Sequence, residues 1–279
     1  MIFLAVTAAV MWGVGNFAMG IAVRESSPRA TVLVGFGTGL LAALIFSAIQ
    51  RPIIQLADFA WGILAGLAQG IGWLAFSRAL KATSIGAAAP IAATTTTAVL
   101  FIGGLATGSG LTALAALGIA IALIAIVLLS DRTAARPATS SSALPGYGMA
   151  LSAGLLFSLQ SVALDRAGVD ASSLVLIGTG FGVLMVLAAT VTVRRIPLIQ
   201  FQRAAVGSSI GGLLIFGGDA GYLYALARGV PVSATVIAQL HPLVTALLAG
   251  FLLRERVSHR QLAGMALALS AVTIIGMSH

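Results

Sequence analysis

Ten apolar stretches, each about as long as a helix that crosses a lipid bilayer, follow one another along the 279 residues of this chain. Charged residues make up 8% of the chain, whereas a soluble domain carries about 25%. We therefore expect an all-α integral membrane protein with ten transmembrane helices. The stretches are Met1–Val23, Thr31–Ile49, Phe59–Ser77, Ser84–Leu105, Leu111–Ser130, Tyr147–Leu164, Ser172–Val193, Ala204–Ala227, Pro231–Leu253 and Gln261–Met277.

One connection reads as a linker, because Pro, Ser and charged residues become frequent in residues 132–146. It separates a first set of five helices, residues 1–131, from a second set, residues 147–279. The two halves repeat: segment 52–56 (PIIQL) matches segment 197–201 (PLIQF), 145 positions later. Glycines 66 and 72 match glycines 212 and 218, 146 positions later. A unit with an odd number of helices places its copy in the opposite orientation, so we expect two inverted five-helix repeats.

Basic residues are distributed unequally between the two sides of this predicted topology. The connections after helices one, three, five, seven and nine hold 12 of the 15 Arg and Lys residues, and the other side holds Arg51, Arg166 and Arg228. Loops rich in Arg and Lys lie in the cytoplasm. We therefore expect a multi-pass protein of the cell (inner) membrane with both termini outside the cytoplasm.

Several classes of function find no support in the residues. The chain has no cysteine, and its 3 histidines are too dispersed for a metal site. Its basic residues form no stripe of the kind that binds nucleic acid. Segment 35–39 (GFGTG) resembles a dinucleotide loop, but it lies inside an apolar run, which favours helix packing. We expect no metal, no cofactor, no nucleic-acid partner and no enzymatic activity, and we expect a monomer or a weak dimer.

Asp219 is the one acidic residue inside an apolar run, where a charge costs about 2.5 to 3.5 kcal/mol on insertion scales. Such a residue indicates a functional site, although a hydrogen bond to a neighbouring helix would also explain it. If its helix enters the membrane near Ala204, Asp219 lies roughly 22 Å deep at about 1.5 Å per residue, a little past the midplane. His241, about eleven residues into the next helix, is the expected proton partner. We assign ion coupling to this pair, with proton and substrate competing for the carboxylate.

Polar and aromatic side chains at middle depth on several other helices predict a substrate cavity between the halves. Packing contacts between helices, or an aromatic belt facing lipid, would be the alternative roles of these side chains. Trp12 and Asn16 share one helix face, as do Gln69 and Trp73. The predicted substrate-binding residues are Trp12, Asn16, Gln69, Trp73, Thr94, Gln160, Tyr222 and Gln239.

The segments 12–17 (WGVGNF), 241–243 (HPL), 253–258 (LRERVS) and 261–264 (QLAG), together with the two five-helix halves, resemble the EamA-type transporters of the drug/metabolite transporter superfamily. The resemblance implies a ten-helix transporter of small organic solutes, often an exporter of amino acids or other metabolites. Arg254 stands where the family often has glycine, and segment 107–110 (TGSG) in the first half has no acidic residue.

The resulting hypothesis is a secondary transporter that exports a small organic metabolite, an amino acid or a related solute, by alternating access coupled to a proton or solute gradient. Two alternatives stay open at this point. One is uptake or facilitated diffusion of a sugar or metabolite, and the other is a membrane-embedded enzyme or a lipid-carrier flippase. An enzyme would need several converging acids, bases or metal ligands, and a lipid-carrier flippase would be indicated by a cationic cavity open to lipid.

Overall fold

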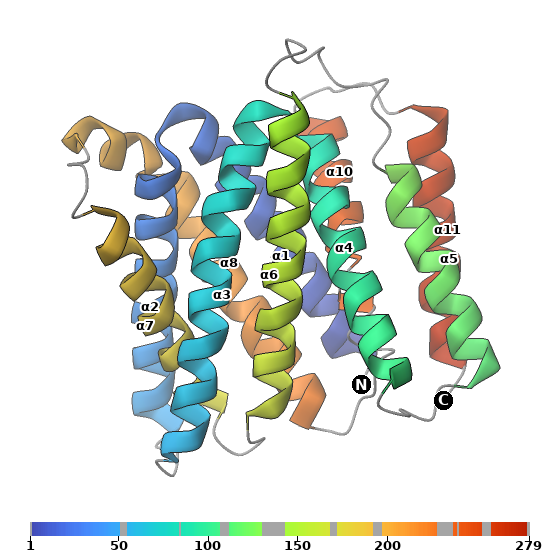
Figure 1. Cartoon of the computed structure of the whole chain (residues 1–279), viewed down its shortest axis with the longest axis horizontal. Helices are drawn as coiled ribbons and strands as arrows, with labels where there is room; N and C mark the ends of the chain where they lie inside the picture. Colours follow the sequence, from blue (N-terminus) through green and yellow to red (C-terminus); the bar gives the residue numbers. More distant parts are fainter. Residues whose placement is uncertain are drawn as a thin grey trace.

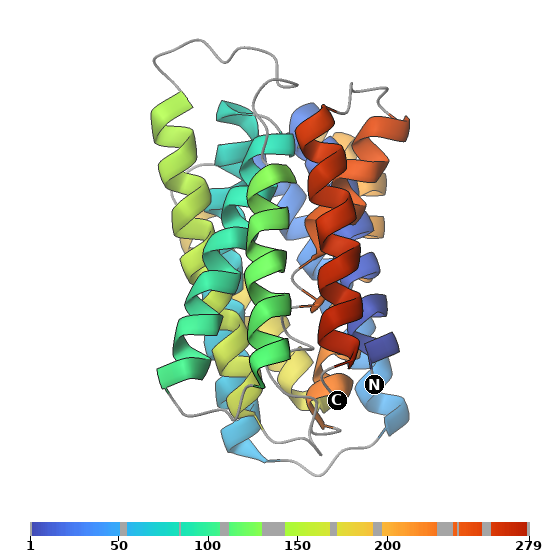
Figure 2. The same ribbon diagram turned by 90° about the vertical axis from the view of Figure 1, so that its right-hand side faces the viewer.

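The structure is a computed structural model that describes residues 2–50, 55–83, 85–106, 112–129, 143–167, 172–191, 197–227, 237–238, 240–252 and 258–277. Every regular element within these ranges is an α-helix, as the apolar runs predict. The helices are α1 (Ile2–Glu25), α2 (Pro28–Gln50), α3 (Leu56–Ala82), α4 (Ile85–Ala106), α5 (Ala113–Leu129), α6 (Ala143–Arg166), α7 (Ser172–Val191), α8 (Leu198–Ala227), α10 (His241–Leu252) and α11 (His259–Met277). They lie side by side along their lengths, with α5 beside α11 at one end of the bundle (Figures 1 and 2).

Several helices differ in length from the apolar runs that predict them. α8 begins at Leu198 instead of Ala204, so Asp219 lies 21 residues, about 32 Å, from the start of its helix. The helix therefore extends about 9 Å farther before Asp219 than the apolar run predicted. α6 begins at Ala143, inside the segment predicted as a linker. Polar ends of a helix continue its hydrogen bonding beyond the apolar core, and hydropathy alone does not detect them.

The helix expected over Pro231–Leu253 is interrupted. Leu240 lies in a turn and α10 begins at His241; residues 231–236 and 239 lie outside the described residues. Pro242 is well placed at this start, because proline lacks the N–H that the first helical turn leaves unpaired. His241 therefore stands at a helix N-terminus, not eleven residues inside a continuous helix.

The outer faces of the helices are apolar. Among the described residues, five helices are long and apolar enough to cross a membrane: α1, α2, α3, α6 and α8. Large apolar side chains are exposed on many helices, including Phe3 (78%), Ile49 (75%) and Phe251 (84%). A surface of this kind is stable in lipid and not in water. The protein is thus a multi-pass membrane protein.

Helix packing repeats when the two halves are exchanged. With α1 to α5 as the first half and α6, α7, α8, α10 and α11 as the second, each of the most extensive packed pairs has an equivalent pair or joins two equivalent helices. α1 packs on α8 as α6 packs on α3, α2 on α8 as α7 on α3, and α4 on α6 as α10 on α1; α2 also packs on α7, and α5 on α11.

The order of contacts along these pairs gives the relative direction of the helices. α1 and α8 are antiparallel, because Ala22 lies near Gly207 and Trp12 near Gly218. Their equivalents α6 and α3 are antiparallel too, with Gly146 near Ala82 and Phe157 near Gly72. α3 and α7 are parallel, with contacts Gly62 to Val175, Gly66 to Thr179 and Gly70 to Val183. α2 and α8 are likewise parallel, with contacts Gly35 to Gly212 and Gln50 to Tyr224.

Two equivalent glycines allow the closest helix approaches. A Cβ on Gly66 would overlap the backbone carbonyl of Thr179, and a Cβ on Gly212 would overlap that of Gly35. Lipid supplies no hydrophobic driving force between helices, so their association depends on close van der Waals packing, which small residues permit. These contacts bring α3 and α8 toward the centre of the bundle, where both helices carry the polar side chains described next.

Candidate functional site

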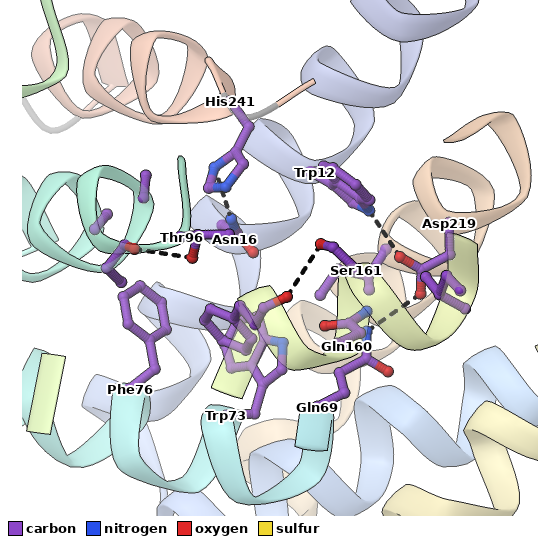
Figure 3. A pocket seen from close by; sticks show the side chains of 16 residues that line it. Trp12, Asn16, Gln69, Trp73, Phe76, Thr96, Gln160, Ser161, Asp219 and His241 are labelled. Carbon is purple, nitrogen blue, oxygen red and sulfur yellow. Dashed lines mark hydrogen bonds between the residues drawn. The ribbon is translucent and has the colours of Figure 1, made fainter. Parts of the chain in front are cut away.

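A cavity lies between the two halves of the bundle (Figure 3). It has a volume of about 600 Å³, a figure that includes its opening. Side chains from α1, α3 and α4 line it together with side chains from their equivalents α6, α8 and α10.

Asp219 on α8 is the acidic residue of the cavity wall and is 4% exposed. Its Oδ1 accepts a hydrogen bond from Trp12 Nε1 at 3.0 Å, and its Oδ2 accepts one from Gln69 Nε2 at 3.2 Å. Both donors are neutral. No Arg or Lys side chain lines the described cavity, so no basic side chain offsets a negative charge on this carboxylate.

Aromatic rings form the opposite wall of the cavity. Trp73 is 3% exposed, and its ring centroid lies 5.3 Å from that of Phe76 and 6.4 Å from that of Phe157. Phe76 and Phe157 also meet edge to face, at 6.1 Å. These interlocked rings give α3 and α6 a rigid apolar surface next to the polar groups.

His241 enters the cavity from the start of α10. Asn16 Nδ2 lies 3.1 Å from His241 Nδ1; with the amide N–H as donor, the ring is neutral and carries its proton on Nε2. α10 is held against α1, because Thr245 Oγ1 donates to the carbonyl oxygen of Gly13 at 3.0 Å. His241 and Asp219 line the same cavity but share no hydrogen bond; the ring of Trp12 contacts both.

The α4 and α6 side of the cavity combines fixed and free polar groups. Thr96 Oγ1 lies 3.0 Å from the carbonyl oxygen of Ala92 and 2.9 Å from that of Gly154, which ties α4 to α6. Ser161 Oγ donates to the carbonyl oxygen of Phe157 at 3.0 Å. Gln160, 7% exposed, makes no hydrogen bond with the part of the chain that the structure describes. Its amide is therefore available to a bound molecule.

The repeat relates the two walls of the cavity. The offset of 146 that matches Gly72 to Gly218 also matches Trp73 to Asp219. A Cβ on Gly72 would meet the ring of Phe157, and a Cβ on Gly218 would meet the ring of Trp12. In each half, a glycine packs against an aromatic ring from the other half, and the residue after that glycine lines the cavity. That residue is Trp73 in the first half and Asp219 in the second.

Most predicted site residues meet in this cavity. Trp12, Asn16, Gln69, Trp73, Gln160, Asp219 and His241 line it. Thr94 and Tyr222 do not. Tyr222 is 2% exposed and packs behind Trp12, with ring centroids 5.5 Å apart, and Thr96 occupies the lining position on α4. Gln239 lies outside the described residues.

Sequence reasoning missed the apolar part of the lining. Phe157, Gln160, Ser161 and Leu164 follow one another at intervals of three, one and three, the spacing of a single helix face, and all four line the cavity. That spacing was the available signal for Phe157 and Leu164. Phe76 lies three residues after Trp73 and follows the same rule. Nothing in the sequence marks Ile215.

A second, smaller space adjoins the acid. It has a volume of about 290 Å³, its opening included, and is lined by residues of α2, α3, α7 and α8. Gln69 and Asp219 line this space as well as the main cavity, so their hydrogen bond forms part of the partition between the two. Within the described residues no group of three or more His, Asp or Glu is placed to hold a metal ion.

An all-helical bundle with apolar outer faces and a polar cavity between two related halves belongs to the class of multi-pass membrane proteins that bind small solutes. Residues 1–131 and 144–277 match the EamA-like transporter family, and the chain belongs to this family. The match confirms the resemblance drawn from the sequence. This is a family of membrane transporters of small solutes.

The comparison with solved structures supports the fold. A protein described only as "Crystal structure of protein" superposes with a TM-score of 0.73 at 17% sequence identity, covering 99% of this chain and 96% of that chain. At this identity the likeness shows the fold alone. No curated protein matches the chain.

Proposed function

We propose that this protein is a secondary transporter that exports a small organic metabolite, an amino acid or a related solute, by alternating access. In this proposal the ten helices all cross the membrane as two inverted repeats, with both termini outside the cytoplasm. The symmetric pairing of helices and the directions of α1, α3, α6 and α8 support the inverted arrangement. The segregation of 12 of 15 basic residues supports the sidedness.

One observation carries the proposal: the buried carboxylate of Asp219 stands in a cavity built from equivalent helices of both halves. A site between two halves can be exposed to one side or the other as the halves rock, whereas a site within one half cannot. The aromatic wall and the free amide of Gln160 supply apolar and polar contacts for a small solute.

Asp219 provides the coupling in this scheme. The ionised carboxylate accepts two hydrogen bonds from neutral donors and carries an uncompensated charge. Either a proton or a substrate group can neutralise it, so the two compete for one site. Exchange of one for the other across the membrane would let an inward proton gradient drive export of the substrate. His241 lines the same cavity and offers its Nε2 proton to the substrate or to a water between the two side chains.

The test begins with a thermal-shift screen of amino acids, sugars, polyamines and nucleobases on the purified protein. A solute that stabilises the protein is then loaded into proteoliposomes, and its transport is measured across a range of pH. Asp219→Asn keeps the size of the side chain and one oxygen acceptor but removes its titration. We expect the pH dependence of transport to disappear in this variant, with the protein still folded.

Asp165→Asn is the matched control, because it makes the same chemical change at an exposed position near the end of α6. It should retain the pH profile of the unmodified protein. If Asp219→Asn also retains that profile, Asp219 is a structural hydrogen-bonding residue and the coupling scheme is wrong.

A further inference from the structure

We infer that the cavity selects organic monocations, namely amines that carry no carboxylate and have a flat apolar body, over amino acids and organic anions. This inference rests on the proposed function, since it takes the cavity as the substrate site. Within the proposed class of amino acids and related solutes, it favours amines over the amino acids themselves, on the balance of charge and hydrogen-bonding groups on the cavity wall.

The first argument is charge. Asp219 is the acid of the described lining, and no Arg or Lys joins it. Trp12 and Gln69 donate hydrogen bonds to its two oxygens but contribute no positive charge. A carboxylate has about four lone-pair sites, so acceptor capacity remains on both oxygens. An ammonium group would use that capacity and cancel the charge in one step.

A zwitterion fits this wall poorly. Its ammonium group would pair with Asp219, but its own carboxylate would then lie in the same low-dielectric space without a cation to meet it. While Asn16 Nδ2 donates to its Nδ1, the ring of His241 is neutral and does not supply that cation. Gln160 offers an amide N–H, which solvates a carboxylate without neutralising it.

The second argument is the shape and chemistry of the facing wall. Trp73, Phe76 and Phe157 pack edge to face with centroid separations between 5.3 and 6.4 Å. Aromatic faces bind both apolar rings and cations, the latter within about 6 Å of a ring centroid. A molecule with a flat apolar body and one amine can therefore place its body on this wall and its charge at Asp219. Gln160 is left to bond a further N–H or hydroxyl group.

The experiment compares four small molecules that share a phenylethyl skeleton and differ chiefly in charge. They are 2-phenylethylamine and L-phenylalanine methyl ester, which are cations, L-phenylalanine, a zwitterion, and 3-phenylpropionate, an anion. Calorimetry on the full-length protein in lipid nanodiscs gives their affinities at a pH where both amines are protonated. We expect the two cations to bind at least about tenfold more tightly than the zwitterion and the anion.

Two variants at the acid and one control locate the origin of this preference. Asp219→Asn should lower the affinity for both cations by about tenfold or more and remove the discrimination against phenylalanine. Asp219→Glu retains the charge and should retain the preference for cations even if absolute affinity falls. Asp165→Asn, at the exposed end of α6, should bind all four molecules as the unmodified protein does.

Equal or tighter binding of L-phenylalanine, or no binding of either cation, would overturn the inference. Neither result touches the proposed function, which would survive if another solute is transported with a pH profile that depends on Asp219. Conversely, tight binding of the amines without any transport would support the cation site and count against the transporter mechanism.

Discussion

At the scale of single residues, the cavity depends on side chains that are placed by glycines. Trp12 can donate to Asp219 because residue 218 is a glycine; a Cβ there would occupy the position of the indole ring. Phe157 reaches Trp73 in the same way, past Gly72. A single methyl group at either glycine would therefore displace a ring that forms the cavity wall.

Replacing Trp73 is the most direct test of solute binding at the aromatic wall. Trp73→Ala removes the central ring of the aromatic wall but leaves Asp219 and its two donors in place. For a solute identified by the thermal-shift screen, we expect a loss on the order of 1 kcal/mol or more, measured by calorimetry. Trp61→Ala is the control, because Trp61 packs in the buried cluster around Tyr222 and does not line the cavity. Unchanged affinity in Trp73→Ala, together with unchanged affinity on replacing Trp12, Asn16 and Gln69 by alanine, would place the site elsewhere.

At the scale of helices, the bundle is held by close approaches that only glycine permits. α3 meets α7 at Gly66, and α8 meets α2 at Gly212, the equivalent residue of the second half. Because α3 carries Gln69 and Trp73 and α8 carries Asp219, these contacts set the distance between the two walls of the cavity. Loss of close packing at either contact would separate the groups that bind the carboxylate.

Gly66→Ala tests this packing. The added methyl group would meet the backbone of Thr179, which cannot rotate away, so the helices must separate. We expect a loss of stability of about 1–3 kcal/mol, the usual cost of an overpacked interface, measured as a lower unfolding temperature in lipid or detergent. Gly37→Ala on α2 is the matched control, since nothing lies within 4 Å of the added Cβ. Equal unfolding temperatures for the two variants would show that the α3 and α7 contact tolerates a wider spacing.

At the scale of the whole molecule, the exchange of halves preserves the most extensive helix contacts. α5 and α11, the last helices of the two halves, pack on each other beside the six helices that form the cavity (Figure 2). The remaining helices, α2 and α7, are equivalent to each other and also pack together. Two related halves with matching interfaces can exchange conformations, which is the property that alternating access requires.

The sidedness of this arrangement is open to a direct test. Twelve of 15 basic residues lie on the side predicted to face the cytoplasm. A reporter that is active only outside the cytoplasm, fused after His279, should therefore be active, and the same reporter inserted in the connection between α5 and α6 should be inactive. The reverse pattern would invert the topology and, with it, the direction of transport in the proposed cycle.

The sequence by itself determined the class of the protein, the repeat and the family. These properties follow from the length and hydropathy of each segment and from matches between segments, which are all local features of the chain. Asp219 could be singled out for the same reason, because an acid in an apolar run is conspicuous without any neighbour. The tertiary structure was not needed to expect a cavity between the halves.

Only the tertiary structure decided which side chains meet. These helices are apolar on all sides, so no polar stripe fixes their rotation, and adjacent residues differ by about 100° around the axis. Packing therefore selected Thr96 over Thr94 for the lining and turned Tyr222 behind Trp12. It also joined Trp12 to Asp219 across 207 positions and Asn16 to His241 across 225. Contacts at such separations depend on the relative placement of whole helices, which local hydropathy and repeat patterns do not specify.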